Sequence, residues 1–117
     1  MVYCSEHVSL AALEILVHTQ PVTIRDKFRV FRVSWDAKMM ITVDLKKLPK
    51  GWNAQPPSSI SKNVGDNWVR SAQSVVLAIP SVIVPAERTF LLNRDHHDFG
   101  KIKIKDTGSF CLDPRLR

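Results

Sequence analysis

Glu14 stands out in the run "SLAALEILVH" (residues 9–18) because it places a charge among regularly spaced apolar residues. Leu10, Leu13 and Val17 recur at intervals of three and four, which predicts the buried stripe of an amphipathic helix. Glu14 follows Leu10 by four residues, so its carboxylate falls on or beside that stripe. A charge there is unfavourable unless it is paired or faces a pocket, which makes Glu14 a candidate site residue. The plainer interpretation is a carboxylate that reaches solvent or pairs with a nearby arginine.

Ser81 and Tyr3 are two further candidates. Ser81 directly follows an aliphatic run in "IPSVIVP", between Pro80 and Pro85, at the kind of strand end where loops often build sites. The alternative is a turn serine whose hydroxyl bonds its own backbone. Tyr3 is the single tyrosine of the chain, and a tyrosine on a strand usually packs in the core or at its rim. Taken alone, these residues suggest a site without defining a reaction.

Histidines and cysteines give no metal or disulfide signature. His96 and His97 are adjacent in sequence, and adjacent residues rarely point at one ion, so we predict no metal site. The two cysteines, Cys4 and Cys111, lack CxxC-type spacing, and we expect both to be reduced.

The net charge of +6, with a pI near 9.7, raises a nucleic-acid hypothesis. Its distribution argues against that role, because the lysines form two small clusters, Lys46/Lys47/Lys50 and "KIKIK" (residues 101–105). The alternation of the second cluster predicts a strand with isoleucines toward the core and lysines toward solvent, where they also protect an edge. A positive field equally attracts a phosphate-bearing small molecule or an acidic partner protein.

The 117 residues predict one small α+β domain dominated by strands. We expect strands at residues 2–5, within 22–34, and at 38–45, 74–80, 89–93 and 101–105, helices at 9–18 and 61–73, and a turn or short helix at 94–100. The run "SVVLAIP" (residues 74–80) shows no alternation and is typical of a central strand buried on both faces. No membrane-spanning run or secretory signal is evident, which favours a cytoplasmic protein.

Four segments together resemble the RES domain family along nearly the whole chain: "VYCSEHVSLAALEILVH", "LPKGW", "GDNWVRSAQSVVLAIPSVIVPAERTFLLNRDHHDF" and the terminal "DPRLR". The resemblance implies an ADP-ribosyltransferase-like fold, with a mostly antiparallel sheet and a few short helices. It implies a bacterial type II toxin that consumes NAD⁺ as substrate, by phosphorolysis or hydrolysis of the nicotinamide–ribose bond. Some relatives instead transfer ADP-ribose to a protein. The implied partner is a helix-turn-helix (Xre-type) antitoxin that covers the active site.

The family takes its name from an arginine, a glutamate and a serine, and the resemblance assigns two of these. The glutamate falls on Glu14, where a carboxylate can stabilise an oxocarbenium-like ribose. The serine falls on Ser81, with Ser71 and Ser74 as nearby alternatives, and it can bond the nicotinamide amide or a ribose hydroxyl. Tyr3 matches a family tyrosine that can stack on a flat ring of NAD⁺.

The family arginine has no counterpart in this sequence. In the family it lies upstream of the tyrosine strand, whereas here Met1 precedes Tyr3 by two residues and Arg25, Arg29 and Arg32 all follow the helix. A guanidinium is the natural grip for a pyrophosphate, so its loss should weaken NAD⁺ binding. We therefore expect residues 1–117 to be a single, N-terminally shortened RES domain. The alternative to an active toxin is an inactive remnant that keeps only an antitoxin-binding surface.

Overall fold

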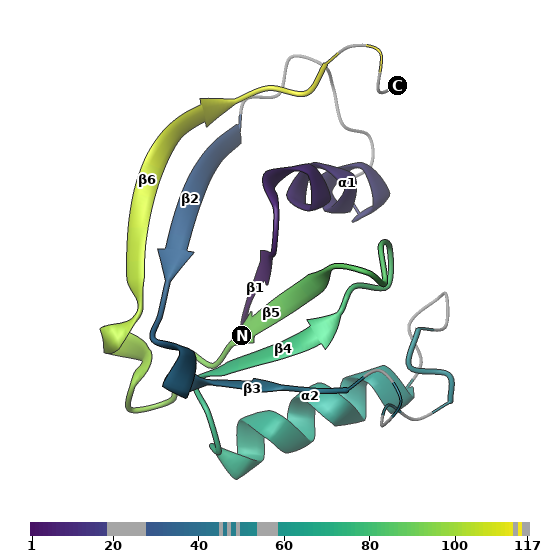
Figure 1. The fold of residues 1–117 in the computed structure, drawn as a ribbon, viewed down its shortest axis with the longest axis vertical. Coiled ribbons are helices and arrows are strands. Elements are labelled where there is room, and N and C mark those ends of the chain that lie inside the picture. Colours follow the sequence, from purple (N-terminus) through teal and green to yellow (C-terminus); the bar gives the residue numbers. More distant parts are fainter. Residues whose placement is uncertain are drawn as a thin grey trace.

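The computed structural model describes residues 1–18, 28–44, 46, 48, 50–53, 59–113 and 115. Its centre is a four-stranded sheet in the order β1-β5-β4-β3 (Figure 1). The strands are β1 (Val2–Ser5), β3 (Met40–Thr42), β4 (Val76–Pro80) and β5 (Arg88–Leu92). Both pairings of β5 are antiparallel, whereas β3 runs parallel to β4.

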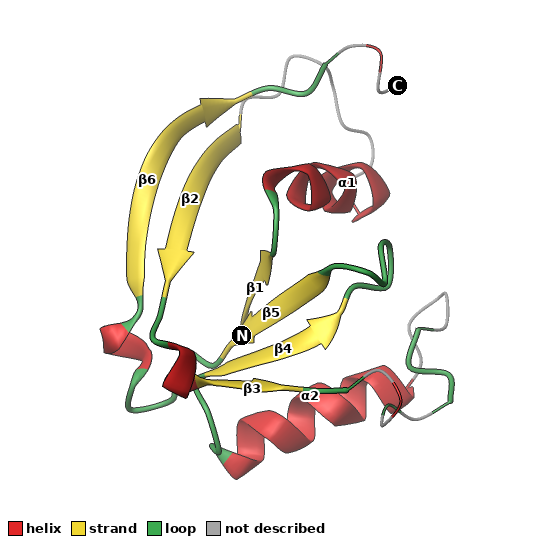
Figure 2. Ribbon diagram, viewed as in Figure 1, coloured by secondary structure: helices red, strands yellow, loops and turns green. Residues whose placement is uncertain are grey.

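The remaining elements lie on either side of this sheet. They are α1 (Val8–His18), α2 (Ser59–Ser71), the strands β2 (Phe28–Ser34) and β6 (Lys103–Phe110), and 3-10 turns at Ala37–Met39 and Phe99–Lys101. β2 and β6 pair with each other as an antiparallel two-stranded ribbon, while α2 lies along the four-stranded sheet (Figure 2). The structure confirms the α+β class and the mostly antiparallel pairing.

The predicted central strand is confirmed by the position of β4 between β3 and β5. Strand alternation sends Val76 and Ala78 to one face of the sheet, where they pack with Phe90 and Leu92. The intervening Leu77 faces the other side of the sheet. There it packs with Leu91 of β5 and with Trp68 of α2. Because helix and ribbon cover opposite faces, β4 is apolar on both, which explains the absence of alternation in its sequence.

A buried hydrogen-bond relay fixes α2 against the sheet. The indole N–H of Trp68 donates to the hydroxyl of Ser74 at 2.9 Å, and that hydroxyl donates to the backbone carbonyl of Val76 at 2.8 Å. The helix stops directly after Ser71, where Ala72 adopts a left-handed φ of 52°. The indole N–H of the buried Trp68 and the hydroxyl of Ser74 therefore both have hydrogen-bond partners.

Two details of the predicted apolar patterning are wrong. Among the α1 residues whose burial the structure describes, only Leu10 is buried, while Leu13 and Val17 are 38% and 52% exposed, because this helix covers one end of the sheet and not a broad face. In "KIKIK", Ile102 is buried but Ile104 is 57% exposed, because β6 starts only at Lys103 and runs in the ribbon. The strand expected at residues 38–45 is shorter, since Asp36 caps a 3-10 turn over its first residues.

Candidate functional site

Glu14 lies in the middle of α1, one turn beyond the buried Leu10. The helix follows β1 closely, with the backbone N–H of Ala11 donating to the carbonyl of His7 in its first turn. Glu14 is partly buried, so part of the residue keeps access to solvent. That placement suits a carboxylate that meets a ligand at the surface of the domain.

Tyr3 presents its ring to solvent from β1, with 68% of the residue exposed. It lies opposite Leu91 in the sheet, and Leu91 packs with Trp68 on the face that α2 covers. Its neighbours Val2 and Cys4 pack into the opposite, ribbon-side core. An exposed ring of this kind is available for stacking, and its direction is set by strand alternation.

Ser81 directly follows β4 and organises the loop that leads to β5. Its backbone N–H donates to the carbonyl of Glu87 at 2.8 Å, and its hydroxyl accepts from the N–H groups of Ile83 (3.1 Å) and Val84 (3.2 Å). The residue is only 1% exposed. Its observed bonds are those of the turn-serine alternative, and its hydroxyl hydrogen remains a donor.

The alternative serines also serve the scaffold. Ser74 is buried in the tryptophan relay, and the hydroxyl of Ser71 donates to the carbonyl of Trp68 at 2.8 Å. All three serines therefore serve the scaffold, and the choice of Ser81 as the family serine stays a prediction from the resemblance.

Replacement of Ser81 by alanine should lower the free energy of unfolding by about 1–2 kcal/mol, because two partly buried N–H groups lose their acceptor. Urea denaturation measures this change. The exposed Ser109 on β6 provides the matched control, and Ser109→Ala should change the stability by less than about 0.5 kcal/mol. Equal stability of both variants and the parent protein would show that the Ser81 hydroxyl does not hold the loop.

A charged clamp that the sequence reasoning missed joins Glu6 to Arg88. One carboxylate oxygen of Glu6 accepts from Nε and Nη2 of Arg88 at 3.2 and 3.1 Å, and the other accepts from the Arg88 backbone N–H at 2.9 Å. The guanidinium also lies over the ring of Phe90, 5.1 Å from its centroid. The partners are 82 residues apart, so only the β1–β5 pairing reveals them.

This clamp should make stability depend on pH. The backbone N–H and guanidinium of Arg88 hold the pKa of Glu6 below its usual value. A carboxyl with a lowered folded-state pKa stabilises the protein above its unfolded pKa of about 4.3, and this contribution is lost as pH falls through the folded value. Urea denaturation at pH 7 and at pH 3 should show a smaller difference for Glu6→Gln than for the parent protein. An identical difference in both proteins would exclude this role for Glu6.

Tyr3 and Ser81 are not neighbours in the sheet, because β5 separates β1 from β4. The described part of the chain has two open hollows, of about 390 and 330 Å³. The first is lined by Met1, Asp66, Val69, Arg70, Asn93 and Asp95; the second by Asp36, Lys38, Met39, Gln73, Ser74, Val75, His96, Asp98 and Lys101. Neither is lined by Glu14, Tyr3 or Ser81.

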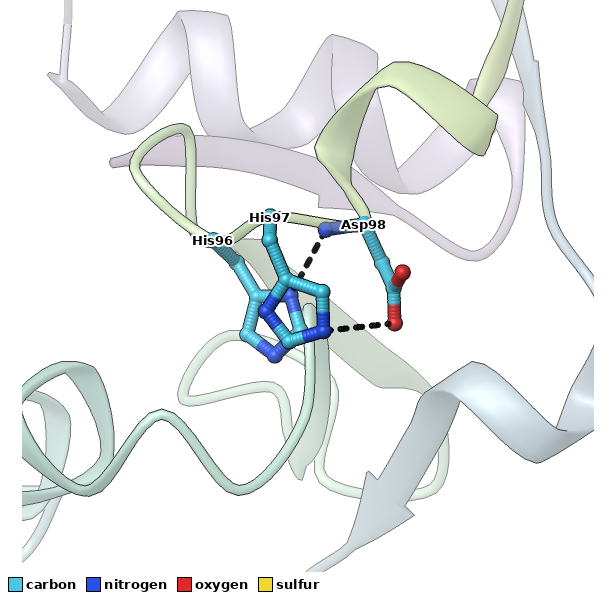
Figure 3. A group of neighbouring side chains, drawn as sticks. All are labelled: His96, His97 and Asp98. Atoms are coloured by element: carbon cyan, nitrogen blue, oxygen red, sulfur yellow. Dashed lines mark hydrogen bonds and ion pairs between the residues drawn. The ribbon is translucent and has the colours of Figure 1, made fainter.

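His96, His97 and Asp98 bring three metal-type ligand atoms close together (Figure 3). Nδ1 of the buried His96 accepts from the Asp98 backbone N–H at 3.0 Å, so its Nε2 carries the proton and donates to the carbonyl of Ala72 at 3.1 Å. His97 stacks on His96 and lies 3.6 Å from the Asp98 carboxylate. Because both nitrogens of His96 already serve the backbone, the trio fits a folded turn better than a metal centre.

Both cysteines are free thiols. Cys4 is partly buried in the ribbon-side core, where burial raises the pKa of its thiol, and Cys111 is exposed. No described helix has the length and apolar character needed to cross a bilayer.

Comparison with known proteins decides the family. The RES domain family matches residues 1–113. The chain belongs to the RES domain family. Among its relatives is Toxin Res of Yersinia enterocolitica, 32% identical over 117 residues, which cover 99% of this chain and 77% of the relative. Toxin Res of Photorhabdus laumondii is 34% identical over 98% and 74% of the two chains, and the Prs ADP-ribosylating toxin of a Sphingobium strain is 29% identical over 99% and 74%.

Glu14 and Ser81 stay our predictions for the glutamate and the serine that give the RES family its name. Of the three arginines between α1 and the end of β2, Arg29 and Arg32 lie on β2, and Arg25 falls outside the described residues. Arg29 is engaged with Asp106 of β6 at 2.8 Å. Among the described arginines of this RES domain, Arg88 is the one that a carboxylate holds at the start of the inner strand β5, beside the Ser81 loop.

Proposed function

We propose that this RES domain is a bacterial toxin that degrades NAD⁺ by breaking the bond between nicotinamide and ribose. The observation that carries the proposal is the family match over residues 1–113, together with relatives that bear the name Toxin Res. Glu14 on α1 supports it, because a partly buried carboxylate suits a reaction that passes through a cationic ribose.

In the proposed reaction the Glu14 carboxylate lies beside the ribose and stabilises the positive charge that grows as nicotinamide leaves. Water or phosphate then attacks the anomeric carbon. The exposed ring of Tyr3 stacks on a flat part of NAD⁺, and the Ser81 hydroxyl donates to the nicotinamide amide or a ribose oxygen. With Ser81 1% exposed, its contact requires the loop between β4 and β5 to open.

The proposal includes a setting and a partner. NAD⁺ is the substrate, and the reaction uses no resident cofactor or metal. The toxin acts in the cytoplasm as half of a type II toxin–antitoxin pair, and a helix-turn-helix antitoxin of the Xre type neutralises it. Nucleic acid is contacted only through that antitoxin.

Controlled expression in a bacterial culture tests the proposal. Induction of the chain should arrest growth and lower the cellular NAD⁺ content within one generation, and induction of Glu14→Ala should do neither. Normal growth and normal NAD⁺ content, with the folded protein present at the same level as Glu14→Ala, would refute the proposal.

A second candidate is ADP-ribosyl transfer to a protein. The name of the Sphingobium relative, an ADP-ribosylating toxin, favours it. The bond broken is the same, and the acceptor is a protein side chain in place of water or phosphate. Incubation of a cell extract with the chain and biotin-labelled NAD⁺ separates the two, because only transfer leaves biotin on protein.

A third candidate is an inactive remnant that retains an antitoxin-binding surface. It is favoured by the burial of Ser81 and by the position of Tyr3 on the α2 side of the sheet. A remnant binds the antitoxin with unchanged affinity when Glu14 is replaced, and it leaves NAD⁺ intact.

A further inference from the structure

The ribbon of β2 and β6 stands to one side of the central sheet, with β6 at its outer margin (Figure 1). One edge of β6 pairs with β2, and no described strand pairs with its other edge. A strand edge of this kind presents a row of backbone N–H and carbonyl groups to which another strand can pair.

The start of β6 carries a regular pattern at that edge. Lys103, Ile104 and Lys105 are all exposed, and Ile104 exposes 57% of its surface. Strand alternation places the two lysines on one side of the ribbon and Ile104 on the other. This is the stretch whose isoleucine was expected in the core, and the structure leaves it uncovered.

The lysine side of the ribbon also holds a like-charge pair. Arg32 of β2 lies directly opposite Lys105 in the register, and like charges in that position destabilise a sheet. Among the described residues no carboxylate pairs with Arg32, Lys103 or Lys105. The neighbouring Arg29, in contrast, is neutralised within the ribbon by Asp106.

We propose that the outer edge of β6 accepts a strand from a partner protein in which acidic and apolar residues alternate. Residues two apart on an extended strand are about 6.8 Å apart, so two glutamates of the partner meet Lys103 and Lys105. The apolar residue between them covers Ile104. The partner thereby supplies both the counter-charges and the apolar surface that the ribbon lacks, whether or not the domain cleaves NAD⁺.

Other occupants fit the ribbon less well. The three cations Arg32, Lys103 and Lys105 would release few counterions from a nucleic acid. The exposed Ile104 would make no favourable contact with a phosphate backbone. Two cations of neighbouring elements are already paired, Arg88 with Glu6 and Lys101 with Asp98. A second copy of this chain would set lysine against lysine along the same edge.

Peptide titration tests the proposal. The probe is a fluorescein-labelled peptide, Thr-Glu-Val-Glu-Val-Glu-Thr, and its binding is followed by fluorescence anisotropy and by hydrogen exchange of the backbone amides of residues 103–105. We expect saturable binding with slower exchange, and affinity at least about tenfold lower for Lys103→Glu/Lys105→Glu. The control Lys46→Glu/Lys62→Glu makes the same charge change at exposed lysines elsewhere and should alter affinity by less than about twofold.

A second peptide of identical composition, Glu-Glu-Glu-Val-Val-Thr-Thr, removes the alternation and should bind at least about fivefold more weakly. The proposal is overturned if the alternating peptide does not bind, if both peptides bind equally, or if the two charge variants behave alike. Tighter binding of a single-stranded RNA or duplex DNA 12-mer would also overturn it in favour of a nucleic acid. NAD⁺ turnover, measured separately on Lys103→Glu/Lys105→Glu, should equal that of the parent protein, so failure of the enzymatic proposal is recognised independently.

Discussion

Leu92→Ala is expected to lower the free energy of unfolding by about 3 kcal/mol, within the 2–5 kcal/mol range of buried leucine truncations. Leu92 is fully buried on β5, directly opposite Val2 of β1 and Val76 of β4. The truncation removes apolar contacts from three adjacent strands at once, and the sheet backbone restrains them from closing the cavity. Urea denaturation followed by tryptophan fluorescence measures the change.

Ile104→Ala is the matched control for Leu92→Ala, since it removes a similar side chain from an exposed position of the ribbon. It should change stability by less than about 0.5 kcal/mol. Comparable losses for both variants would contradict the assignment of the core to the four-stranded sheet and not to the ribbon.

If the proposed reaction is correct, Glu14→Gln slows NAD⁺ cleavage at least about a hundredfold, because the amide keeps the shape of the side chain and removes the charge that we propose stabilises the cationic ribose. Thermal unfolding should change little, since the residue is only partly buried. Fluorometric measurement of remaining NAD⁺ gives both rates on equal amounts of folded protein.

Asp66→Asn makes the same chemical change at an exposed carboxylate of α2 and should leave the rate of NAD⁺ cleavage within about twofold of the parent protein. If Glu14→Gln also retains the parent rate, the carboxylate of Glu14 is not part of the reaction.

The elements predicted most accurately are those whose sequence pattern reports local burial. β1 was predicted with its observed bounds, α1 within one residue, and β4 within two, because short apolar runs and helical spacing reflect the immediate environment. The burial of Leu13 and of Ile104 was predicted wrongly. Both errors have one cause: periodicity gives the side of an element that is apolar, but not whether another element covers it.

The candidate site was predictable only where a residue type carried meaning by itself. Glu14 attracted notice as a charge in an apolar run, and the structure places it partly buried on α1. The clamp between Glu6 and Arg88 had no local signal, because it depends on which strands pair. The tight bonding of Ser81 was open as an alternative, and the geometry of its loop supplies the missing information.

Analysis of the reaction products by mass spectrometry tests the central claim most directly. NAD⁺ is incubated with the purified chain in phosphate-free buffer and in phosphate buffer. We predict release of nicotinamide in step with NAD⁺ loss, accompanied by ADP-ribose when water is the acceptor or by an ADP-ribose phosphate when phosphate is. Intact NAD⁺ in both buffers, with protein that unfolds cooperatively in urea, would contradict NAD⁺ cleavage by this domain.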